Sequence, residues 1–258
     1  MKPKKSLGQN FLRNKEALTK IVVAADLGVE QNVLEIGPGE GVLTVELMKK
    51  AGRILAVEKD DRLIEKLKLK NEKLKIIRGD ILEVNLPKLL EENSFTNYKL
   101  VANIPYYITG KILRLFLETQ YQPSLMVLLT QKEVAERIVE KDNKSSILSL
   151  SVKLFGWVEI IDYVARESFY PVPKVDSAII KITPHLHQKS KEEIKSLMRI
   201  IKIGFASPRK TLLNNLAAGL NKEKLKIEEI LVSNEIDLNV RAESLSLVQW
   251  ENLRNKLE

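Results

Sequence analysis

Short apolar runs and amphipathic helical segments alternate along the first 140 residues of the chain. Five apolar runs have the length and composition of buried strands: Val33–Ile36, Arg53–Val57, Leu74–Ile77, Leu100–Ala102 and Leu125–Leu129. The segments around them carry apolar residues at helical spacing: Glu16–Ala25, Leu43–Lys50, Arg62–Leu69, Lys111–Glu118 and Lys132–Glu140. Strands that alternate with helices in this way predict an α/β fold with a doubly wound, mostly parallel sheet.

The pattern changes after residue 156. Two strand-like segments, Val158–Ala165 and Ser177–Thr183, flank a proline-containing connection, which predicts an antiparallel strand pair at one end of the sheet. A linker follows at residues 184–189, and helical periodicity then returns in four segments: Glu192–Gly204, Thr211–Leu220, Leu225–Val232 and Leu247–Leu257. The sequence therefore predicts two domains, an α/β domain over residues 1–184 and a small all-helical domain over residues 185–258.

Candidate ligand-binding residues directly follow the predicted strands. Gly37, Glu58, Asp80 and Asn103 each stand just after a different one. Because right-handed crossovers bring the loops after parallel strands to one edge of the sheet, we expect these residues to meet in one crevice.

The segment Glu35–Gly41 favours a cofactor that lacks phosphates. Its glycines, among them Gly37 and Gly39, let the backbone approach a ligand closely. Glu58 ends the next strand, where a carboxylate can accept hydrogen bonds from two ribose hydroxyls, and Asp80 can accept from an adenine amino group. The spacing is G-x-G-x-G, whereas a dinucleotide site has G-x-G-x-x-G, so the pattern favours S-adenosylmethionine. A dinucleotide oxidoreductase and a plain glycine-rich turn remain alternatives.

The tetrapeptide Asn103-Ile104-Pro105-Tyr106 suits the binding of an exocyclic amine on a planar base. The Asn103 side-chain oxygen and the Ile104 carbonyl can each accept one N–H of the amine. Pro105 restricts the backbone, and Tyr106 can stack on one face of the base. We expect Phe169 to cover the other face, although a core aromatic beneath a turn is the alternative. These five residues are the candidate catalytic residues.

Composition narrows the possible partners and chemistry. The 258 residues include 42 basic and 34 acidic side chains, a net charge of +8, which favours an anionic partner. Six basic residues against Glu16 alone stand among the first twenty, and a solvated tail is the alternative interpretation there. The candidate contacts to phosphates of such a partner are Lys4, Lys5, Arg13, Lys174, Arg209 and Lys210.

Several classes of site are excluded. The chain has no cysteine, and its two histidines, His185 and His187, stand in the predicted linker, which excludes disulfides and argues against a zinc site or a histidine-based triad. We therefore expect no metal. No apolar run is long enough to span a membrane, and the N-terminus lacks the apolar core of a signal peptide, so we expect a cytoplasmic protein.

Short motifs over nearly the whole chain resemble those of the ribosomal RNA adenine dimethyltransferases, and most closely the bacterial small-subunit enzymes. The motifs stand in the family's order: Leu7–Leu12, Glu35–Gly41, Glu58–Asp60, Gly79-Asp80, Asn103–Thr109, Gln131–Val134, Phe169–Ala178, Arg209–Leu212 and Arg241–Glu243. Two positions depart from the family pattern, Tyr107, where asparagine is frequent, and Pro208, where a second arginine is frequent.

The resemblance implies a Rossmann-like class I methyltransferase that uses S-adenosylmethionine. It implies a cofactor site that includes Asn10 and Leu12 beside Gly37, Glu58, Asp80 and Asn103. It also implies transfer of two methyl groups to N6 of each of two adjacent adenosines near the 3′ end of 16S rRNA, with the helical domain binding RNA. We expect the protein to act as a monomer on the small ribosomal subunit or its precursor.

Two alternatives remain open beside this function. One is the related enzyme that methylates an adenosine of 23S rRNA and confers macrolide resistance, although Arg241–Glu243 and Gln131–Glu133 favour the small-subunit enzyme. The other is a non-catalytic RNA-binding assembly or transcription factor on the same scaffold. That alternative predicts a damaged cofactor site, whereas every candidate position here holds a competent residue.

Overall fold

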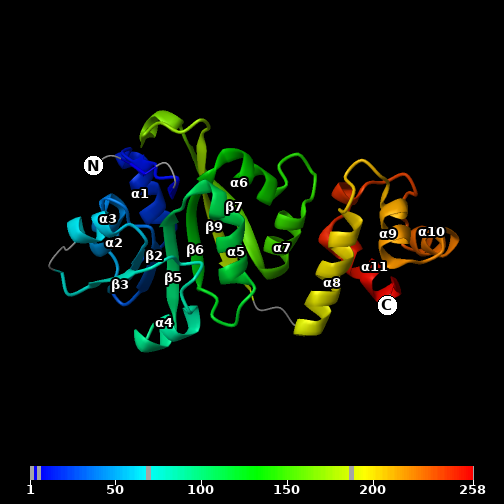
Figure 1. Ribbon diagram of the computed structural model, residues 1–258, viewed down its shortest axis with the longest axis horizontal. Helices are drawn as coiled ribbons and strands as arrows, with labels where there is room; N and C mark the ends of the chain where they lie inside the picture. The colour runs from blue at the N-terminus through cyan, green and yellow to red at the C-terminus, as the bar shows by residue number, and fades with distance from the viewer. Residues whose placement is uncertain (1–2, 5–6, 68–70, 186–188, 258) are drawn as a thin grey trace. The chain divides into compact units, whose positions relative to one another are not determined.

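The computed structural model describes residues 3–4, 7–67, 71–185 and 189–257 (Figure 1). By its internal contacts the chain forms two compact units. The first unit contains Met1–Ala135 and Gly156–His185, and the second contains Glu136–Phe155 and Leu186–Glu258. In the described part of the chain, no helix combines the length and apolarity needed to cross a bilayer.

A seven-stranded sheet in the order β4-β3-β2-β5-β6-β9-β7 organises the first unit. The parallel strands are β2 (Asn32–Ile36), β3 (Arg53–Glu58), β4 (Leu74–Arg78), β5 (Tyr98–Asn103) and β6 (Leu125–Gln131). The antiparallel strands β9 (Ser177–Pro184) and β7 (Gly156–Val164) complete one end. The predicted α/β fold, with a mostly parallel sheet and an antiparallel pair at one end, is confirmed.

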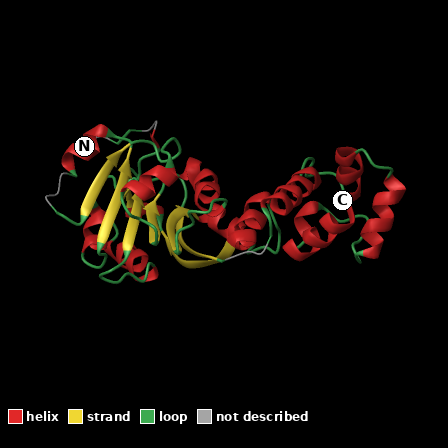
Figure 2. Ribbon diagram, turned by 90° about the horizontal axis from the view of Figure 1, so that it is seen from below, coloured by secondary structure: helices red, strands yellow, loops and turns green. Residues whose placement is uncertain are grey.

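Helices on both faces of the sheet complete this unit (Figure 2). They are α1 (Lys15–Ala24), α2 (Val42–Met48), α3 (Asp61–Lys66), α4 (Leu86–Glu92) and α5 (Thr109–Leu117), while α6 (Lys132–Val139) runs across the boundary between the units. Helix α1 begins where the Asn14 side chain accepts a hydrogen bond from the Ala17 N–H at 3.0 Å, the usual role of an N-cap. Its buried face, with Leu18 and Ile21, joins the core beneath β2 and β6. Helix α4 is absent from the sequence prediction.

A two-stranded ribbon connects distant parts of the first unit. Strand β1 (Phe11–Leu12) pairs with β8 (Phe169–Tyr170), so that Leu12 faces Phe169 across the ribbon. Leu12 and Phe169 are buried and belong to the core that contains Leu18. Two-residue strands leave no periodicity to detect, and the sequence does not predict this pairing.

The second unit is helical. It contains α7 (Ile147–Phe155), α8 (Lys191–Gly204), α9 (Leu212–Leu220), α10 (Lys224–Ser233) and α11 (Leu247–Leu257). A capping box begins α8, since Ser190 and Glu193 exchange side-chain and backbone hydrogen bonds. Trp250 is fully buried at the centre, and a Cβ at Gly204 would lie only 2.3 Å from its ring, so glycine allows α8 to approach α11.

One predicted domain boundary needs correction. The break predicted between residues 184 and 185 lies one residue from the observed break after His185, but residues 136–155, assigned to the α/β domain, belong to the second unit. Helix α7 packs against α8 and α11, and the Ser145 hydroxyl donates to the carbonyl oxygens of Glu243 (3.0 Å) and Leu245 (2.5 Å). No helix over Ile147–Phe155 is predicted from the sequence, and the position of a segment in the sequence does not identify the elements that it packs against.

Candidate active site

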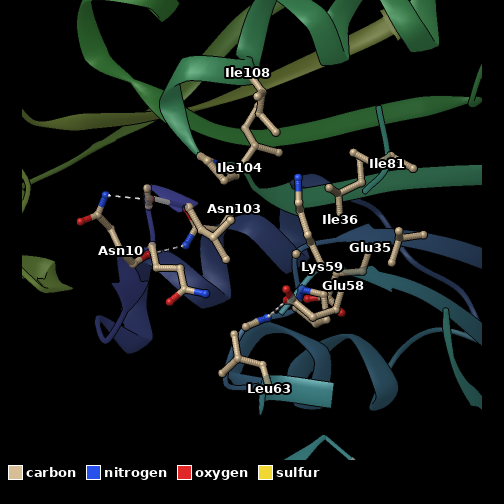
Figure 3. Close-up of a pocket in the computed structure, with 18 of the residues that line it drawn as sticks. Asn10, Glu35, Ile36, Glu58, Lys59, Leu63, Ile81, Asn103, Ile104 and Ile108 are labelled. Atoms are coloured by element: carbon tan, nitrogen blue, oxygen red, sulfur yellow. Dashed lines mark hydrogen bonds between the residues drawn. The ribbon is translucent and has the colours of Figure 1, made fainter. Parts of the chain in front are cut away.

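A cavity of about 490 Å³ opens at the carboxyl edge of the parallel strands in the first unit (Figure 3). The strand-end residues expected to meet there, Gly37, Glu58, Asp80 and Asn103, all line it. The other predicted site residues along its wall are Asn10, Leu12, Gly39, Ile104, Pro105 and Tyr106. The topology therefore brings the whole predicted cofactor set and most of the predicted catalytic set to one place.

The loop after β2 forms one wall of the cavity through backbone rather than side chains. Gly39 and Gly41 have φ of +62° and +81°, a region that favours glycine. A Cβ at Gly39 would lie 3.1 Å from the Phe11 ring, and one at Gly41 would lie 2.6 Å from Leu67 Cδ2. The missing side chains thus let this loop pass between strand β1 and helix α3.

Glu58 is buried at the end of β3, with both carboxylate oxygens partly engaged. Oε2 accepts from the Gly39 N–H at 3.1 Å and Oε1 from the Asp60 N–H at 2.8 Å. Burial raises the pKa of Glu58, while the backbone N–H groups of Asp60 and Gly39 oppose that rise. Each carboxylate oxygen has a second lone pair, so Glu58 retains capacity for ligand hydroxyls.

Asp80 is an ionised acceptor after β4. Its Oδ2 accepts from Lys59 Nζ at 2.7 Å and its Oδ1 from the Leu82 N–H at 3.0 Å. Burial raises the pKa of Asp80, but the hydrogen bonds from Lys59 and Leu82 outweigh this effect and hold the pKa below its ordinary value. Lys59 itself lines the cavity, and the sequence analysis did not select it.

Asn103 is held by the N-terminal segment. Its Nδ2 donates to the Asn10 carbonyl oxygen at 3.1 Å, the contact drawn between the two residues in Figure 3. Oδ1 is the acceptor of this side chain, and the hydrogen bond from Nδ2 to Asn10 fixes its orientation. The Tyr106 hydroxyl shares a 2.7 Å hydrogen bond with Ser177 Oγ on β9, which fixes the ring at the cavity wall.

Phe169 does not reach the cavity. It is 3% exposed and packs in the core, because its pairing with Leu12 turns the ring inward. The next residue, Tyr170, points the other way and is 55% exposed, as expected from alternation along a strand. Besides Tyr106, the aromatic residues along the cavity are the buried Phe11 and Tyr107, which is 65% exposed. Its position directly after Tyr106 was the available signal for it in the sequence.

None of the described candidate RNA contacts is among the residues that line the cavity. Lys4 pairs with Asp60 at 3.2 Å, and Arg13 pairs with Glu40. Lys174 is exposed in the first unit, whereas the exposed Arg209 and Lys210 lie between α8 and α9 of the second. Lys5 lies outside the described residues.

Two further acids of this unit, Asp60 and Glu35, are buried. The Asp60 side chain, fully shielded from solvent, accepts from Arg62 (2.6 and 2.9 Å), Gln9 (2.9 Å) and Lys4 (3.2 Å). These donors, Arg62 foremost, hold its pKa far below the ordinary value. Glu35 lines the cavity and is 1% exposed, and burial raises its pKa to about 8. No group of His, Cys, Asp and Glu in the described residues is arranged to hold a metal ion.

Comparisons with known proteins show the same family over the whole chain. The family described as "Ribosomal RNA adenine dimethylase" matches residues 1–256. The chain is 43% identical to the Ribosomal RNA small subunit methyltransferase A of Dehalococcoides mccartyi, over 98% of this chain and 88% of that protein. It is 36% identical to the protein of the same name from Mycoplasma capricolum, over 99% of this chain and 97% of the relative.

Solved structures show the same architecture. The crystal structure of the 23S rRNA methyltransferase ErmE is 25% identical, with a TM-score of 0.77 over 96% of this chain and 99% of that one. A dimethyladenosine transferase from Plasmodium falciparum is 28% identical, with a TM-score of 0.76 over 94% of this chain and 95% of that one. Both likenesses extend beyond the sheet into the helical unit.

Proposed function

The chain belongs to the ribosomal RNA adenine dimethylase family, and on this premise we propose that it dimethylates N6 of two adjacent adenosines near the 3′ end of 16S rRNA, using S-adenosylmethionine. The observation that carries the proposal is Asn103, whose Nδ2 is bonded to the Asn10 carbonyl while Oδ1 remains an acceptor beside Tyr106. The names of the curated relatives support the small subunit as substrate.

The residues of the cavity fit this cofactor. The volume lies within the range of small-molecule sites. Asp80 and Glu58 are acceptors at the ends of neighbouring strands and would hold the adenine amino group and the ribose hydroxyls, respectively. Gly37 and Gly39 would let the backbone approach the amino-acid end, and Asn10 and Leu12 also line the cavity. When bound, the cofactor supplies an electrophilic methyl group on a sulfonium, so no metal is required for the transfer.

The chain's own contribution is orientation. The lone pair of an adenine amine is delocalised into the ring, so the amine is a poor nucleophile until its geometry is fixed. Asn103 Oδ1 and the Ile104 carbonyl accept its two N–H groups, and alignment of this kind lowers a barrier by roughly 7–11 kcal/mol. The same two dipoles stabilise the positive charge that develops on the nitrogen. Tyr106 stacks on the base, a contact worth about 1–3 kcal/mol.

The target adenosine must leave its helical stack to enter the cavity, which costs a few kcal/mol. Basic residues on both units supply the compensating attraction to phosphates: Lys4, Lys5, Arg13, Lys174, Arg209 and Lys210. RNA binding is therefore expected to weaken as salt rises. The 65% exposed Tyr107, rather than the buried Phe169, is the aromatic side chain at the cavity that remains open to a second stacking contact.

Asn103→Ala tests the role of the amide. We expect methyl transfer to fall by about 10²–10³-fold, the usual effect of losing one positioned polar group at a reacting centre, while RNA binding is largely kept. Transfer of labelled methyl groups to small subunits measures the rate, and filter binding measures RNA affinity. Asn97→Ala, at an exposed position before β5, is the matched control and keeps full activity. Undiminished transfer by Asn103→Ala would refute the assigned role.

An assay on separated ribosomal subunits tests the substrate. Methylation of 16S rRNA at two adjacent adenosines, mapped by mass spectrometry, is the expected result. Methylation confined to 23S rRNA would instead establish the macrolide-resistance activity, and RNA binding without any transfer would establish a non-catalytic factor. We also propose that the protein acts as a monomer in the cytoplasm, which light scattering of the purified protein and fractionation of cells would check.

A further inference from the structure

Tyr170 is an exposed aromatic residue directly beside the wall of the cavity. Strand β1 supplies Phe11 and Leu12 to that wall, and Tyr170 on β8 stands opposite Phe11 in the register of the ribbon. Residues that stand opposite each other in an antiparallel pair have their side chains on the same face, with Cβ atoms about 5 Å apart. Tyr170 therefore lies on the face of the ribbon that carries Phe11, whereas Leu12 and Phe169 lie on the core face.

The side chain of Tyr170 has no partner in the described part of the chain. It is 55% exposed, and neither a hydrogen bond of its hydroxyl nor a contact of its ring exists among the described residues. The other exposed aromatic residues outside the cavity lining are engaged. Trp157 contacts the His185 ring at 4.6 Å between centroids, and Lys132 Nζ lies 5.2 Å from the centroid of the Tyr163 ring. The Tyr170 ring is thus open to a ligand.

The surroundings of this ring are apolar and basic. In the turn that follows it, Val172 and Val175 are exposed apolar side chains, and Lys174 between them is an exposed cation. Directly after β1, the Arg13 N–H donates to the Ser168 carbonyl at 2.7 Å, which brings a second cation to the start of β8. An aromatic ring among cations is typical of proteins that bind single-stranded nucleic acid, where bases stack on the rings and the cations follow the phosphates.

We propose that Tyr170 stacks on the base that neighbours the target adenosine while that adenosine occupies the cavity. This inference rests on the proposed function, in which two adjacent adenosines are modified, so one neighbour of each target is itself an adenine. The target must leave its helical stack to enter the cavity, and the base beside it then loses a stacking partner. The open ring of Tyr170, one strand away from the cavity wall, replaces that partner.

This assignment gives the tyrosines of the edge different roles. Tyr106 lines the cavity, and the hydrogen bond between its hydroxyl and Ser177 fixes the ring for the target base. Tyr170 is not among the residues that line the cavity, so its ring is placed for a base that stays outside. Removal of the Tyr170 ring should therefore weaken the recognition of RNA and leave the binding of the cofactor unchanged.

Methyl transfer to small ribosomal subunits by Tyr170→Ala tests the proposal. We expect kcat/KM for the subunit to fall at least about fivefold, the effect of losing one stacked base, with an unchanged KM for S-adenosylmethionine. Tyr170→Phe keeps the ring and should keep the activity. Trp157→Ala, which removes an exposed aromatic residue outside the cavity lining, is the matched control and leaves both constants unchanged. An unchanged kcat/KM for the subunit in Tyr170→Ala would overturn the proposal.

A change in the RNA tests whether the effect belongs to the neighbouring base. Small subunits reconstituted with 16S rRNA in which one of the two adenosines is replaced by uridine retain one target beside a smaller base. In at least one of the two such substrates, we expect the replacement to lower kcat/KM by a larger factor for the unaltered protein than for Tyr170→Ala. Equal factors for the two proteins in both substrates would contradict the stacking contact.

Tyr170→Leu separates stacking from any disturbance of the ribbon. Leucine keeps apolar bulk beside Phe11 but has no aromatic face, and an unchanged melting temperature verifies the fold. The loss of activity should match that of Tyr170→Ala, and full activity would refute the role of the ring. Undiminished transfer by the Tyr170 variants overturns this inference alone, whereas the absence of small-subunit methylation by the unaltered protein would overturn the proposed function itself.

Discussion

Two equally buried acids near the ends of β2 and β3 differ in charge: Glu35 is protonated at neutral pH, whereas Asp60 is ionised. Glu35 and Asp60 are each 1% exposed. Asp60 receives hydrogen bonds from Arg62, Gln9 and Lys4, and its pKa is lowered, while Glu35 has an unpaired oxygen and its pKa is raised to about 8. Burial alone therefore does not determine whether a carboxyl group is ionised. The hydrogen-bond donors around the group determine it.

The difference also separates a structural acid from an acid available to a ligand. Asp60 caps α3 and attaches the N-terminal segment to the β3 edge through Gln9 and Lys4. Asp60 is not among the residues that line the cavity, whereas Glu35 is. The hydrogen-bonded Asp60 thus stabilises the frame of the first unit, whereas the unpaired oxygen of Glu35 belongs to a residue that lines the cavity.

Removal of Asp60, the acid whose oxygens are hydrogen-bonded, should lower the free energy of unfolding more than the other changes below. Asp60→Ala leaves Arg62, Gln9 and Lys4 without their common acceptor, and we expect the free energy of unfolding in urea to fall by about 3 kcal/mol. The neighbouring Asp61 pairs with Arg78 on the surface, so Asp61→Ala should cost less than about 1 kcal/mol. Equal losses in the two variants would show that the Asp60 cluster has no special role.

Glu35, the acid with an unpaired oxygen, should make the stability of the protein depend on pH. The pKa of Glu35 is about 8 in the folded protein and about 4.3 in an unfolded chain, so the folded state binds more protons between these values. Its contribution therefore makes the protein less stable as pH rises, by up to about 1.4 kcal/mol per pH unit.

Urea unfolding of Glu35→Gln beside the unaltered protein, at intervals from pH 5 to pH 8, measures this contribution. The stability advantage of the variant should grow steadily as the pH increases. A constant difference across the range would mean that Glu35 does not titrate there, which would remove the contrast with Asp60.

The frame of the site was predictable from sequence because strand ends in a parallel sheet share an edge. Gly37, Glu58, Asp80 and Asn103 follow strands whose apolar runs are long enough to recognise, and all four line the cavity. The orientation of Phe169 was not predictable, because it depends on pairing with Leu12 across more than 150 residues of sequence. Tertiary pairing of a two-residue strand leaves no local periodicity.

The special character of Glu35 was also hidden in the sequence. Its residue type and place before the glycine loop were visible, but its protonation depends on the absence of nearby donors, which only packing reveals. The same holds for residues 136–155, whose helix has a buried face that matches α8 and α11 rather than the sheet. Sequence thus indicated which residues were polar or buried, and the contacts determined what each one does.

Thr44 offers the smallest test of the comparison. Because its hydroxyl is buried without a partner in the described residues, the isosteric Thr44→Val change should raise the free energy of unfolding by about 0.5 kcal/mol. Thr109, equally shielded, bonds Thr130 Oγ1 at 2.9 Å and the Tyr106 carbonyl at 3.1 Å, so Thr109→Val should lower it by about 1 kcal/mol. If the free energy of unfolding changed in the same direction in both variants, the distinction between an unpaired and a hydrogen-bonded buried hydroxyl would be contradicted.

The short ribbon of β1 and β8 has a consequence for the order of folding during synthesis. Strand β1 pairs with Phe169–Tyr170, and the Asn10 carbonyl that orients Asn103 lies directly before it. A nascent chain that has not yet exposed residue 170 outside the ribosome cannot complete the wall beside Asn103, even with its first five parallel strands formed. The protein thus acquires its complete pocket late in its own translation.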